Sequence, residues 1–454
     1  MKSHWKRALS GALACIIAAS ATACSSGQSA SSSAESKTAD SSAASKDVKT
    51  LSLLMYTDWY KDGWKALEKY IADHPSEAGF KLDIQKIAGG AQGDQVIETK
   101  FASDDLPDLI ETYNPQWVEA NTNGLDKLVD LTGISSYSEY DDKLMDGAYK
   151  YQGKLYGMPI DSSVLSGIFY NKKVFQELNL TIPKTWNELL SVCAKIKSSG
   201  KNITPVFYSA KDEWTVQVLP LVGLSEDQVA SGLNHTDFMG KINKDQIHFA
   251  DCKNFTNLIG KGKELIDKGY VNKTYLSDTY DNAQTALANG KAAMYPLGTW
   301  VMDQITSKYP DKVKDIGAFA LPTESGQGLV NRWIPFCLSV TTKCSDVEAG
   351  KKAVNFIASA KAQQIYSDAQ PGIYMNNKVR QEKLSFAAQD LVKIQNDGKS
   401  VRDFEELVKY SYGDFGQYML SLYTGTYKSA SDVSKAMDTQ MSKNAQAKGD
   451  TSWK

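Results

Sequence analysis

Histidine and cysteine are scarce in this sequence. The 454 residues include four histidines and six cysteines. His74, His235 and His248 are scattered, without the spacing of metal ligands. The chain also contains no His-Glu-x-x-His zinc motif, no Gly-x-Ser-x-Gly nucleophile elbow and no phosphate-binding Gly-x-x-x-x-Gly-Lys-[Ser/Thr] loop. These absences exclude the usual signatures of zinc hydrolases, serine hydrolases and P-loop nucleotide hydrolases, and the sequence predicts no cofactor and no metal site.

An excess of charge and a long apolar run are missing too. The 51 basic and 53 acidic residues give a formal net charge of −2, and no basic run offers a surface for nucleic acid. The apolar stretch at residues 8–21 is shorter than the ~20 residues that cross a membrane. With 42% hydrophobic and 23% charged residues, the composition is that of a globular protein with a large core. At about 100–200 residues per domain, the length predicts two lobes or slightly more.

The first 47 residues read as a secretion signal followed by a tether. Lys2, Lys6 and Arg7 precede the apolar stretch, and the small residues 21–23 form a processing site just before Cys24. Residues 25–47 hold ten serines and no large apolar side chain, so they cannot bury enough surface to fold. This arrangement predicts a signal peptide at 1–23 and a tether at 24–47.

A cleavable signal, a cysteine and a polar tether together resemble a bacterial lipoprotein. The resemblance implies that Cys24 becomes the acylated first residue of the mature protein, which is then anchored to the outer face of the cell membrane. Ala21 departs from the leucine that this family prefers three residues before the cysteine. The alternative is an ordinary secreted protein with a cysteine near its cleavage site.

From residue 50 onward the pattern alternates between strands and helices. Apolar or alternating runs at 51–57, 80–87 and 108–113 predict three strands, and residues at helical spacing separate them. Thr185 and Glu188 form a capping box at the start of a later helix, and residues 333–340 read as a single strand. Alternating strands and helices predict an α/β fold built from βαβ units.

Four segments in a fixed order resemble the extracellular solute-binding proteins of ABC importers, specifically the sugar binders similar to maltose-binding protein. They are PDLI at 107–110, YQGKLYGMPI at 151–160 with the following residues 169–190, LANGKAAMYPLGTW at 287–300, and the LPT step at 321–323 with the helix around 362–368. Each segment alone is weak evidence, but together they cover most of residues 50–370. Beyond residue 380 the likeness is compositional only.

The resemblance implies a two-lobed fold of the periplasmic-binding-protein type II class, with the ligand in the cleft between the lobes. The chain would cross between lobes near 159–162, return near 321–323, and cross again after residue 369. One lobe would hold residues 48–160 and 322–368, and the other residues 161–321 and 369–454. Each lobe would therefore be discontinuous in sequence.

Tryptophans at the ends of predicted strands are the first candidates for ligand contacts. A pyranose offers apolar faces to aromatic rings and hydroxyls to polar side chains, and such sites place a few polar groups in a mostly apolar cleft. Trp59 follows the first strand, Trp300 ends the Gly-Thr-Trp step, Trp214 lies in a polar stretch and Trp333 is next to Arg332. For each, the alternative is a packed aromatic on the rim of the cleft. Trp64 and Trp186 lie on apolar helix faces and are expected in the core, and Trp453 is expected in a frayed terminus.

Polar residues at the same strand ends are the second group of candidates. They are Asp58, Glu111, Asn114, Asp161, Ser163 and Arg332. A single carboxylate is more often solvated or a helix cap, and Arg332 could instead pair with a carboxylate across the lobes. Asp108 begins a strand and is expected to be structural. Four further cysteines, at positions 193, 252, 337 and 344, allow three disulfide pairings, and the sequence selects none.

The sequence therefore predicts a lipid-anchored, monomeric receptor that captures a sugar, most simply an oligosaccharide, and delivers it to the permease subunits of an ABC transporter. The receptor itself would do no chemistry. Two alternatives stay open. A secreted carbohydrate-active enzyme would use two carboxylates, whose separation cannot be read from the sequence. A surface adhesin would have no enclosed cleft and no small-molecule ligand.

Overall fold

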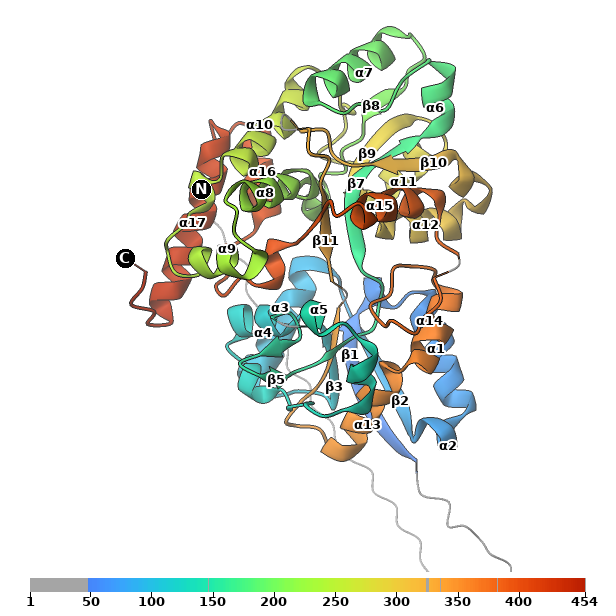
Figure 1. Ribbon diagram of the computed structural model, residues 1–454, viewed down its shortest axis with the longest axis vertical. Coiled ribbons are helices and arrows are strands. Elements are labelled where there is room, and N and C mark those ends of the chain that lie inside the picture. The colour runs from blue at the N-terminus through green and yellow to red at the C-terminus, as the bar shows by residue number, and fades with distance from the viewer. Residues whose placement is uncertain (1–47, 146, 324–325, 335, 382, 454) are drawn as a thin grey trace, which may run out of the picture. The chain divides into compact units, whose positions relative to one another are not determined.

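The computed structural model describes residues 48–453, apart from residues 146, 324, 325, 335 and 382. The predicted signal peptide 1–23, Cys24 and the tether 25–47 lie outside the described residues. Two mixed β-sheets organise the described chain, and each sheet with its helices forms a lobe (Figure 1). The α/β prediction is confirmed. No helix in the described part of the chain has the length and apolar character needed to span a membrane.

The first sheet has the strand order β2-β1-β3-β12-β6. Its strands are β1 (Lys49–Tyr56), β2 (Phe80–Ile87), β3 (Leu109–Thr112), β6 (Met158–Pro159) and β12 (Cys337–Val340). Strand β1 pairs in parallel with β2 and β3, whereas β12 runs antiparallel to β3 and β6. The helices of this lobe are α1 (Asp62–Asp73), α2 (Pro75–Ala78), α3 (Gly90–Ser103), α4 (Pro115–Thr122), α5 (Asp142–Met145), α13 (Val347–Ile357) and α14 (Ala360–Ala369).

The second sheet has the order β13-β11-β7-β9-β8, and β10 also pairs with β7. Its strands are β7 (Val164–Asn171), β8 (Thr204–Val206), β9 (Ala292–Gly298), β10 (Ile316–Phe319), β11 (Val330–Trp333) and β13 (Ser400–Arg402). The helices of this lobe are α6 (Lys172–Glu177), α7 (Trp186–Ser198), α8 (Val218–Ala230), α9 (His235–Ile242), α10 (Lys253–Asp267), α11 (Tyr280–Ala288), α12 (Trp300–Lys308), α15 (Phe386–Asn396), α16 (Phe415–Tyr423) and α17 (Ala430–Ala447).

Short elements complete the chain. A two-stranded hairpin pairs β4 (Lys150–Tyr151) with β5 (Lys154–Leu155). The 3-10 helices are η1 (Thr57–Trp59), η2 (Leu125–Lys127), η3 (Ser135–Glu139), η4 (Glu213–Val216), η5 (Phe249–Asp251), η6 (Pro310–Asp315) and η7 (Phe404–Glu406). Two of them, η1 and η7, lie next to residues discussed below.

The burial of the first strands follows their places in the sheet. β1 is central and its second half is buried, as its continuous apolar run predicts. β2 is at the edge and shows alternating burial. Asp108 accepts hydrogen bonds from the backbone and hydroxyl of Ser52 and from the backbone of Ser345, so it ties β3 to its neighbours as expected. Although partial burial opposes ionisation, these hydrogen bonds lower the pKa of Asp108 to about 2.

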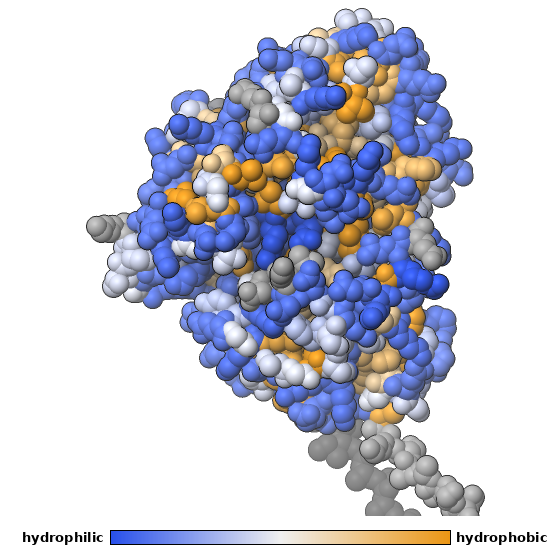
Figure 2. Space-filling view, viewed as in Figure 1, coloured by the Kyte–Doolittle hydropathy of each residue, from blue (hydrophilic) through white to orange (hydrophobic). Residues whose placement is uncertain are grey.

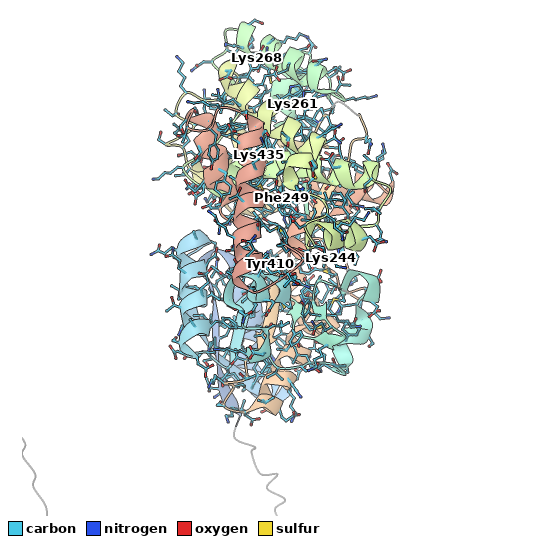
Figure 3. All side chains as sticks on the ribbon, turned by 90° about the vertical axis from the view of Figure 1, so that its left-hand side faces the viewer. Lys244, Phe249, Lys261, Lys268, Tyr410 and Lys435 are labelled. Carbon is cyan, nitrogen blue, oxygen red and sulfur yellow. The ribbon has the colours of Figure 1, made fainter. Side chains whose placement is uncertain are left out.

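The tryptophans assigned to the core are buried, as predicted. Trp64 is 0% and Trp186 is 2% exposed. The prediction for Trp453 was wrong, because its ring is only 6% exposed and meets Tyr410 edge-on at 5.9 Å. Its indole N–H also donates to the backbone of Asn243 at 3.1 Å. Figure 3 shows Tyr410 at one end of α17, with Phe249 further inside the same lobe. The C-terminus is therefore anchored rather than frayed.

The chain passes between the sheets at three places. The first passage lies between β6 and β7. The chain does not return to the first lobe at 321–323, where the sequence predicts the return. The strands on either side of these residues, β10 and β11, both pair with β7 of the second sheet. The return occurs between Trp333 and Cys337, so the predicted strand at 333–340 is divided between two sheets. The third passage follows α14, where Ile373 pairs with Ser163.

The four cysteines of the described chain are free and buried. Burial raises the pKa of Cys193 and of Cys337 to about 12, because it disfavours the thiolate. They pack as small apolar residues, and the described residues contain no disulfide.

Candidate ligand-binding site

Three of the four predicted tryptophans meet in the second lobe. Trp214 comes from η4, Trp300 from the first position of α12 and Trp333 from the end of β11. The ring centroids of Trp214 and Trp300 are 6.1 Å apart, and those of Trp300 and Trp333 are 5.7 Å apart. All three side chains are partly exposed. We call these residues the tryptophan group, and they present aromatic surface from three separate elements.

A glycine allows the tryptophan group to form. A Cβ atom built on Gly298, at the end of β9, would lie only 2.0 Å from the ring of Trp300. Any larger residue there would displace the indole. Packing against Trp300 therefore requires a glycine at position 298.

The fourth tryptophan, Trp59, belongs to a separate aromatic group in the first lobe. Its ring stacks on Phe336 with a centroid distance of 3.4 Å and an interplanar angle of 10°. Tyr113 meets it edge-on at 5.1 Å. Trp59 is only 8% exposed, so one of its faces is already covered by Phe336. A ligand that stacked on that face would have to displace Phe336.

A cluster of buried charges connects the two lobes. Lys61 Nζ lies 3.6 Å from a carboxylate oxygen of Asp161 and 3.7 Å from one of Asp303. Lys61 is the N-cap of α1 in the first lobe, Asp303 is in the first turn of α12 in the second, and Asp161 lies in the first passage. Glu111, at 0% exposure, completes the cluster and accepts a long hydrogen bond of 3.5 Å from the indole of Trp64.

The pKa values of this cluster follow from burial and mutual charge. Burial, with added repulsion from Asp161, raises the pKa of Glu111 well above its usual value. Burial also raises the pKa of Asp303 to about 7, although Lys61 opposes the shift. Burial disfavours the charged form of Lys61, but Asp161 and Asp303 outweigh it and raise the pKa of Lys61. One Glu111 oxygen is buried and has no hydrogen-bond partner among the described residues.

The remaining predicted residues have mixed surroundings. Asn114 is the N-cap of α4 and accepts a hydrogen bond of 2.8 Å from the backbone of Trp117, so part of its side chain is structural. Ser163 is 4% exposed and pairs through its backbone with Ile373. Asp58 is exposed, beside Trp59. Asp161 accepts from the amide of Gln370 at 3.0 Å. These residues do not converge on one point.

Arg332 lies between the tryptophan group and a later acidic segment. Burial lowers the pKa of Arg332, while the charge of Glu406 opposes the shift. Its Nε atom is buried and has no hydrogen-bond partner within the described part of the chain. Trp333, the next residue, donates its indole N–H to Glu405 at 3.3 Å. Lys61, Asp303 and Glu405 were not predicted, although Lys61 and Asp303 lie two and three residues after predicted tryptophans.

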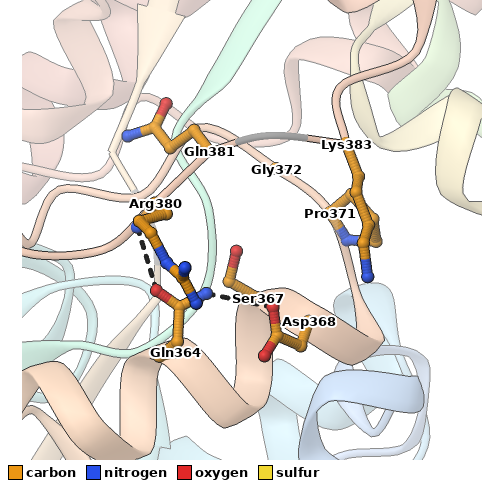
Figure 4. Close-up of a pocket in the computed structure, with 8 residues that line it drawn as sticks. All are labelled: Gln364, Ser367, Asp368, Pro371, Gly372, Arg380, Gln381 and Lys383. Atoms are coloured by element: carbon orange, nitrogen blue, oxygen red, sulfur yellow. Dashed lines mark hydrogen bonds between the residues drawn. The ribbon is translucent and has the colours of Figure 1, made fainter.

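Two small pockets lie away from these residues. One, shown in Figure 4, is on α14 beside the third passage, where Gln364 accepts from the backbone of Arg380 and donates to Asp368. The other lies between α8, α9 and η7 and has a mixed lining, with apolar residues such as Leu221 and Phe238 and polar ones such as His235 and Arg402. Figure 2 shows apolar side chains gathered over α8 and α9, next to strongly hydrophilic ones. Neither pocket contains a predicted site residue.

The tryptophan group and the nearby carboxylates suit a ligand with apolar faces and hydroxyl groups. Indole rings provide large rigid surfaces, and carboxylates accept two or more hydrogen bonds each. No group of histidine, cysteine and acidic side chains in the described chain has the arrangement of a metal site. The geometry therefore favours recognition of an organic ligand by stacking and hydrogen bonds.

Comparisons with known proteins agree with this geometry. The multiple sugar-binding protein of Streptococcus mutans is 28% identical over 322 residues, which are 70% of this chain and 74% of that protein. Among solved structures, a chitin oligosaccharide binding protein superposes with a TM-score of 0.70 at 20% identity, covering 88% of this chain and 100% of the other. RafE in complex with raffinose superposes with a TM-score of 0.66 at 20% identity, covering 86% and 98%.

These structural likenesses establish the two-lobed fold of sugar-binding receptors. The model of the bacterial extracellular solute-binding protein family matches residues 59–364, which include every strand of the two sheets except β1 and β13, and every element of the tryptophan group. This chain therefore belongs to the bacterial extracellular solute-binding protein family.

Proposed function

We propose that this protein captures an extracellular oligosaccharide and delivers it to the permease of an ABC transporter. The observation that carries the proposal is the tryptophan group, in which Trp214, Trp300 and Trp333 present partly exposed rings from three elements. Its setting in a solute-binding family adds support, as do relatives named for multiple sugars, chitin oligosaccharide and raffinose. Several rings in contact suit an extended ligand better than a single small solute.

The mechanism follows from the two lobes and the three passages between them. A ligand held between the tryptophan group and residues of the first lobe would bind the closed arrangement more tightly than the open one. It would then shift the population toward closure by that difference in affinity. The permease would recognise the closed receptor, and the transporter would supply ATP hydrolysis. The receptor itself performs no reaction in this scheme.

The ligand contacts proposed from the sequence divide between the lobes. Trp214, Trp300, Arg332 and Trp333 would form the wall of the second lobe. Asp58, Trp59, Glu111 and Asn114 would form the wall of the first, and Asp161 and Ser163 would lie at the first passage. Asn114 already accepts a structural hydrogen bond on its side-chain oxygen, so it has fewer atoms left for a ligand, whereas Ser163 is tied only through its backbone and keeps its hydroxyl.

A panel of sugars tests the function. Raffinose, stachyose, maltotriose and chitotriose are each added to the purified protein, and the melting temperature and the sugar products are measured. A sugar at one hundred times its dissociation constant stabilises the native state by about 2.7 kcal/mol. We expect at least one sugar to raise the melting temperature and to be recovered intact. Cleavage would indicate an enzyme instead, and no shift with any sugar would favour an adhesin.

The lipid anchor is a separate part of the proposal. The signal at 1–23, Cys24 and the serine-rich tether support acylation of Cys24 and retention at the outer face of the membrane. We expect Cys24→Ala to release the protein into the medium without a change in sugar affinity, because Cys24 precedes the residues that form the two lobes in the sequence. Cell fractionation and titration of the released protein measure both effects. Equal membrane retention of variant and wild type would contradict the anchor.

A further inference from the structure

The side chain of Arg332 carries a charge that the described fold does not compensate. Arg332 lies on β11, one residue before Trp333 of the tryptophan group, and only part of its side chain is exposed. Its guanidinium group forms no hydrogen bond and no ion pair within the described part of the chain, and its Nε atom is buried. A charge removed from water is costly unless it is paired, so this side chain lacks a compensating anion.

Positive charge is in excess on the face of β11 that carries Arg332. Consecutive residues of a strand point to opposite faces, so this is not the face of Trp333. The neighbour of Arg332 in register is Arg402 of β13. Arg402 is paired with Glu406, whose other carboxylate oxygen accepts from the backbone of Ile334 at 3.1 Å. Two guanidinium groups therefore lie beside one carboxylate, and that carboxylate is already used.

The nearby His235 reflects this excess of positive charge. Burial and the charges of Arg402 and Arg332 together lower the pKa of His235 to about 3, so its ring is neutral over the physiological pH range. His235 and Arg402 both line the pocket between α8, α9 and η7. Figure 2 shows strongly hydrophilic side chains between these helices and the first lobe. This part of the second lobe is therefore suited to an anion.

The acidic residues beside Arg332 do not compensate its charge. Burial raises the pKa of Asp403 well above its ordinary value, and it also raises the pKa values of Glu405 and Glu406. Their negative charge is therefore weakened. Each also has a donor elsewhere in the fold, namely Asn331 for Asp403, Trp333 for Glu405 and Arg402 for Glu406. Burial lowers the pKa of Arg332 as well, but an arginine stays protonated in a protein.

Arg332 is directed toward the space between the lobes. The groups that act on its pKa include Tyr149 and Asp141, which belong to the first lobe. Tyr149 is buried and Asp141 is exposed. β11 ends one residue after Arg332, where the chain passes to the first sheet. A ligand that stacks on Trp333 and extends past the end of β11 would therefore meet the guanidinium group.

We propose that Arg332 is a ligand-binding and specificity-determining residue, whose guanidinium group binds the carboxylate of an acidic unit in an oligosaccharide stacked on the tryptophan group. This inference rests on the proposed function and deepens it, because it names the substrate class as oligosaccharides that carry a uronic acid. Guanidinium and carboxylate groups match in geometry and form two parallel hydrogen bonds. A neutral sugar leaves the charge of Arg332 uncompensated, so it binds the same aromatic surfaces more weakly.

Matched pairs of sugars provide the test. A galacturonic acid trimer and a xylotriose that carries glucuronic acid are each compared with the same sugar after reduction of its carboxylates to primary alcohols. Titration calorimetry with wild type should show that at least one acidic sugar binds about tenfold to a hundredfold more tightly than its reduced counterpart. Equal, weaker or undetectable binding of both acidic sugars would overturn the inference.

Substitution of Arg332 should remove this preference. We expect Arg332→Gln to bind the acidic sugar about tenfold to a hundredfold more weakly than wild type, and to bind the reduced sugar like wild type. Arg332→Lys keeps the charge but loses the planar pair of donors, so its affinity for the acidic sugar should be intermediate. Arg380→Gln is the matched control, because Arg380 is an exposed arginine beside the pocket on α14, and it should bind both sugars like wild type.

A structural role for Arg332 predicts a different result. If Arg332 paired with Asp141 across the lobes, Arg332→Gln would lower the melting temperature of the ligand-free protein and weaken both sugars equally. Removal of a cation without a partner should instead leave the melting temperature unchanged or raise it. Equal weakening of both sugars, or an unchanged preference for the acidic one, would overturn the inference. If Arg332→Gln fails to fold, the same comparison is made with Arg332→Lys.

The inference and the proposed function fail in different ways. A wild type that binds neutral sugars without any preference for the acidic ones would overturn the role of Arg332 and leave the sugar receptor intact. A wild type that binds none of the sugars, neutral or acidic, would overturn both.

Discussion

Trp186 and Trp300 each occupy the first position of a helix, yet their surroundings differ. Trp186 is 2% exposed, donates to Glu264 at 2.8 Å and lies under the ammonium group of Lys261. Trp300 is partly exposed, and its ring contacts are Trp214, Trp333 and the backbone at Gly298. The position in the helix therefore does not decide whether a tryptophan is in the core or on a ligand surface. The side chains that surround its ring decide it.

Truncation should separate the two tryptophans. Loss of a buried tryptophan typically costs about 3–5 kcal/mol, so we expect Trp186→Ala to lower the melting temperature sharply. Trp300→Ala should cost the fold less, and it should weaken sugar binding by about 2 kcal/mol or more, which is roughly thirtyfold. Thermal melts and calorimetric titrations on both variants measure the difference. Wild-type affinity in Trp300→Ala would place that residue in the core.

The charge cluster makes stability depend on pH through Asp303. Its pKa is about 7 in the folded protein, compared with an ordinary value of 3.8. A raised pKa stabilises the fold fully below the unfolded value, and this contribution is lost as the pH rises through the folded value. Lys61, Asp161 and Asp62 are the charged groups that act on it. Asp303→Asn removes the titrating proton of this residue and only its contribution to the pH dependence.

We therefore expect the free energy of unfolding of wild type to fall between pH 4 and pH 7 relative to Asp303→Asn. Urea unfolding at pH 4, 5.5 and 7 measures this difference. Lys308→Gln is a suitable control on the same helix, because Lys308 pairs with Asp281 outside the cluster. Parallel pH profiles for wild type and Asp303→Asn would contradict the assignment.

At the scale of elements, local patterns predicted most of the fold. The runs at 51–57, 80–87 and 108–113 correspond to β1, β2 and β3. Burial of a strand on one face or on both produces an alternating or a continuous apolar pattern, which consecutive residues reveal. The run at 333–340 was misjudged. Its first residue belongs to β11, which pairs with β7, and its second half forms β12, which pairs with β3. A continuous apolar run contains no local sign of a change of sheet.

The candidate site likewise depends on contacts between distant elements, which a local sequence pattern does not reveal. Trp214, Trp300 and Trp333 were each predicted, but their contact with one another depends on three elements that are far apart in the sequence. Glu405 was missed because its partner Trp333 lies 72 residues earlier and nothing in the sequence around Glu405 indicates that pairing. Residue types at strand ends are visible in a sequence, whereas side-chain partners across the fold are not.

The cap of α4 offers a test at this scale. Asn114 accepts from the backbone of Trp117, and replacing such a cap by alanine costs about 1 kcal/mol. We expect Asn114→Ala to lower the free energy of unfolding by that amount and Asn114→Ser to restore most of it. Both variants lose the side-chain amide N–H, so both should bind sugar more weakly if Asn114 also contacts the ligand. Chemical unfolding and titration separate the two roles, and wild-type stability of the alanine variant would exclude the cap.

At the scale of the whole molecule, the three passages between the sheets predict closure around a ligand. Only short segments connect the lobes, and hinge motions concentrate in such segments. We expect a saturating amount of the identified sugar to reduce the radius of gyration measured by small-angle scattering. A sugar that produces no thermal shift is the control and should leave it unchanged. An equal radius with and without the bound sugar would argue for a rigid receptor.

The pairing of distant strands also affects how the chain folds after synthesis. β12 pairs with β3, more than 200 residues earlier, and β13 at 400–402 joins the second sheet through β11. The first sheet can be completed only after residue 340 has left the ribosome and the second only after residue 402, and pairings over such separations form slowly. A secreted chain crosses the membrane unfolded. We therefore expect the interleaved strands to delay folding, which would keep a precursor that carries the proposed signal at 1–23 competent for translocation.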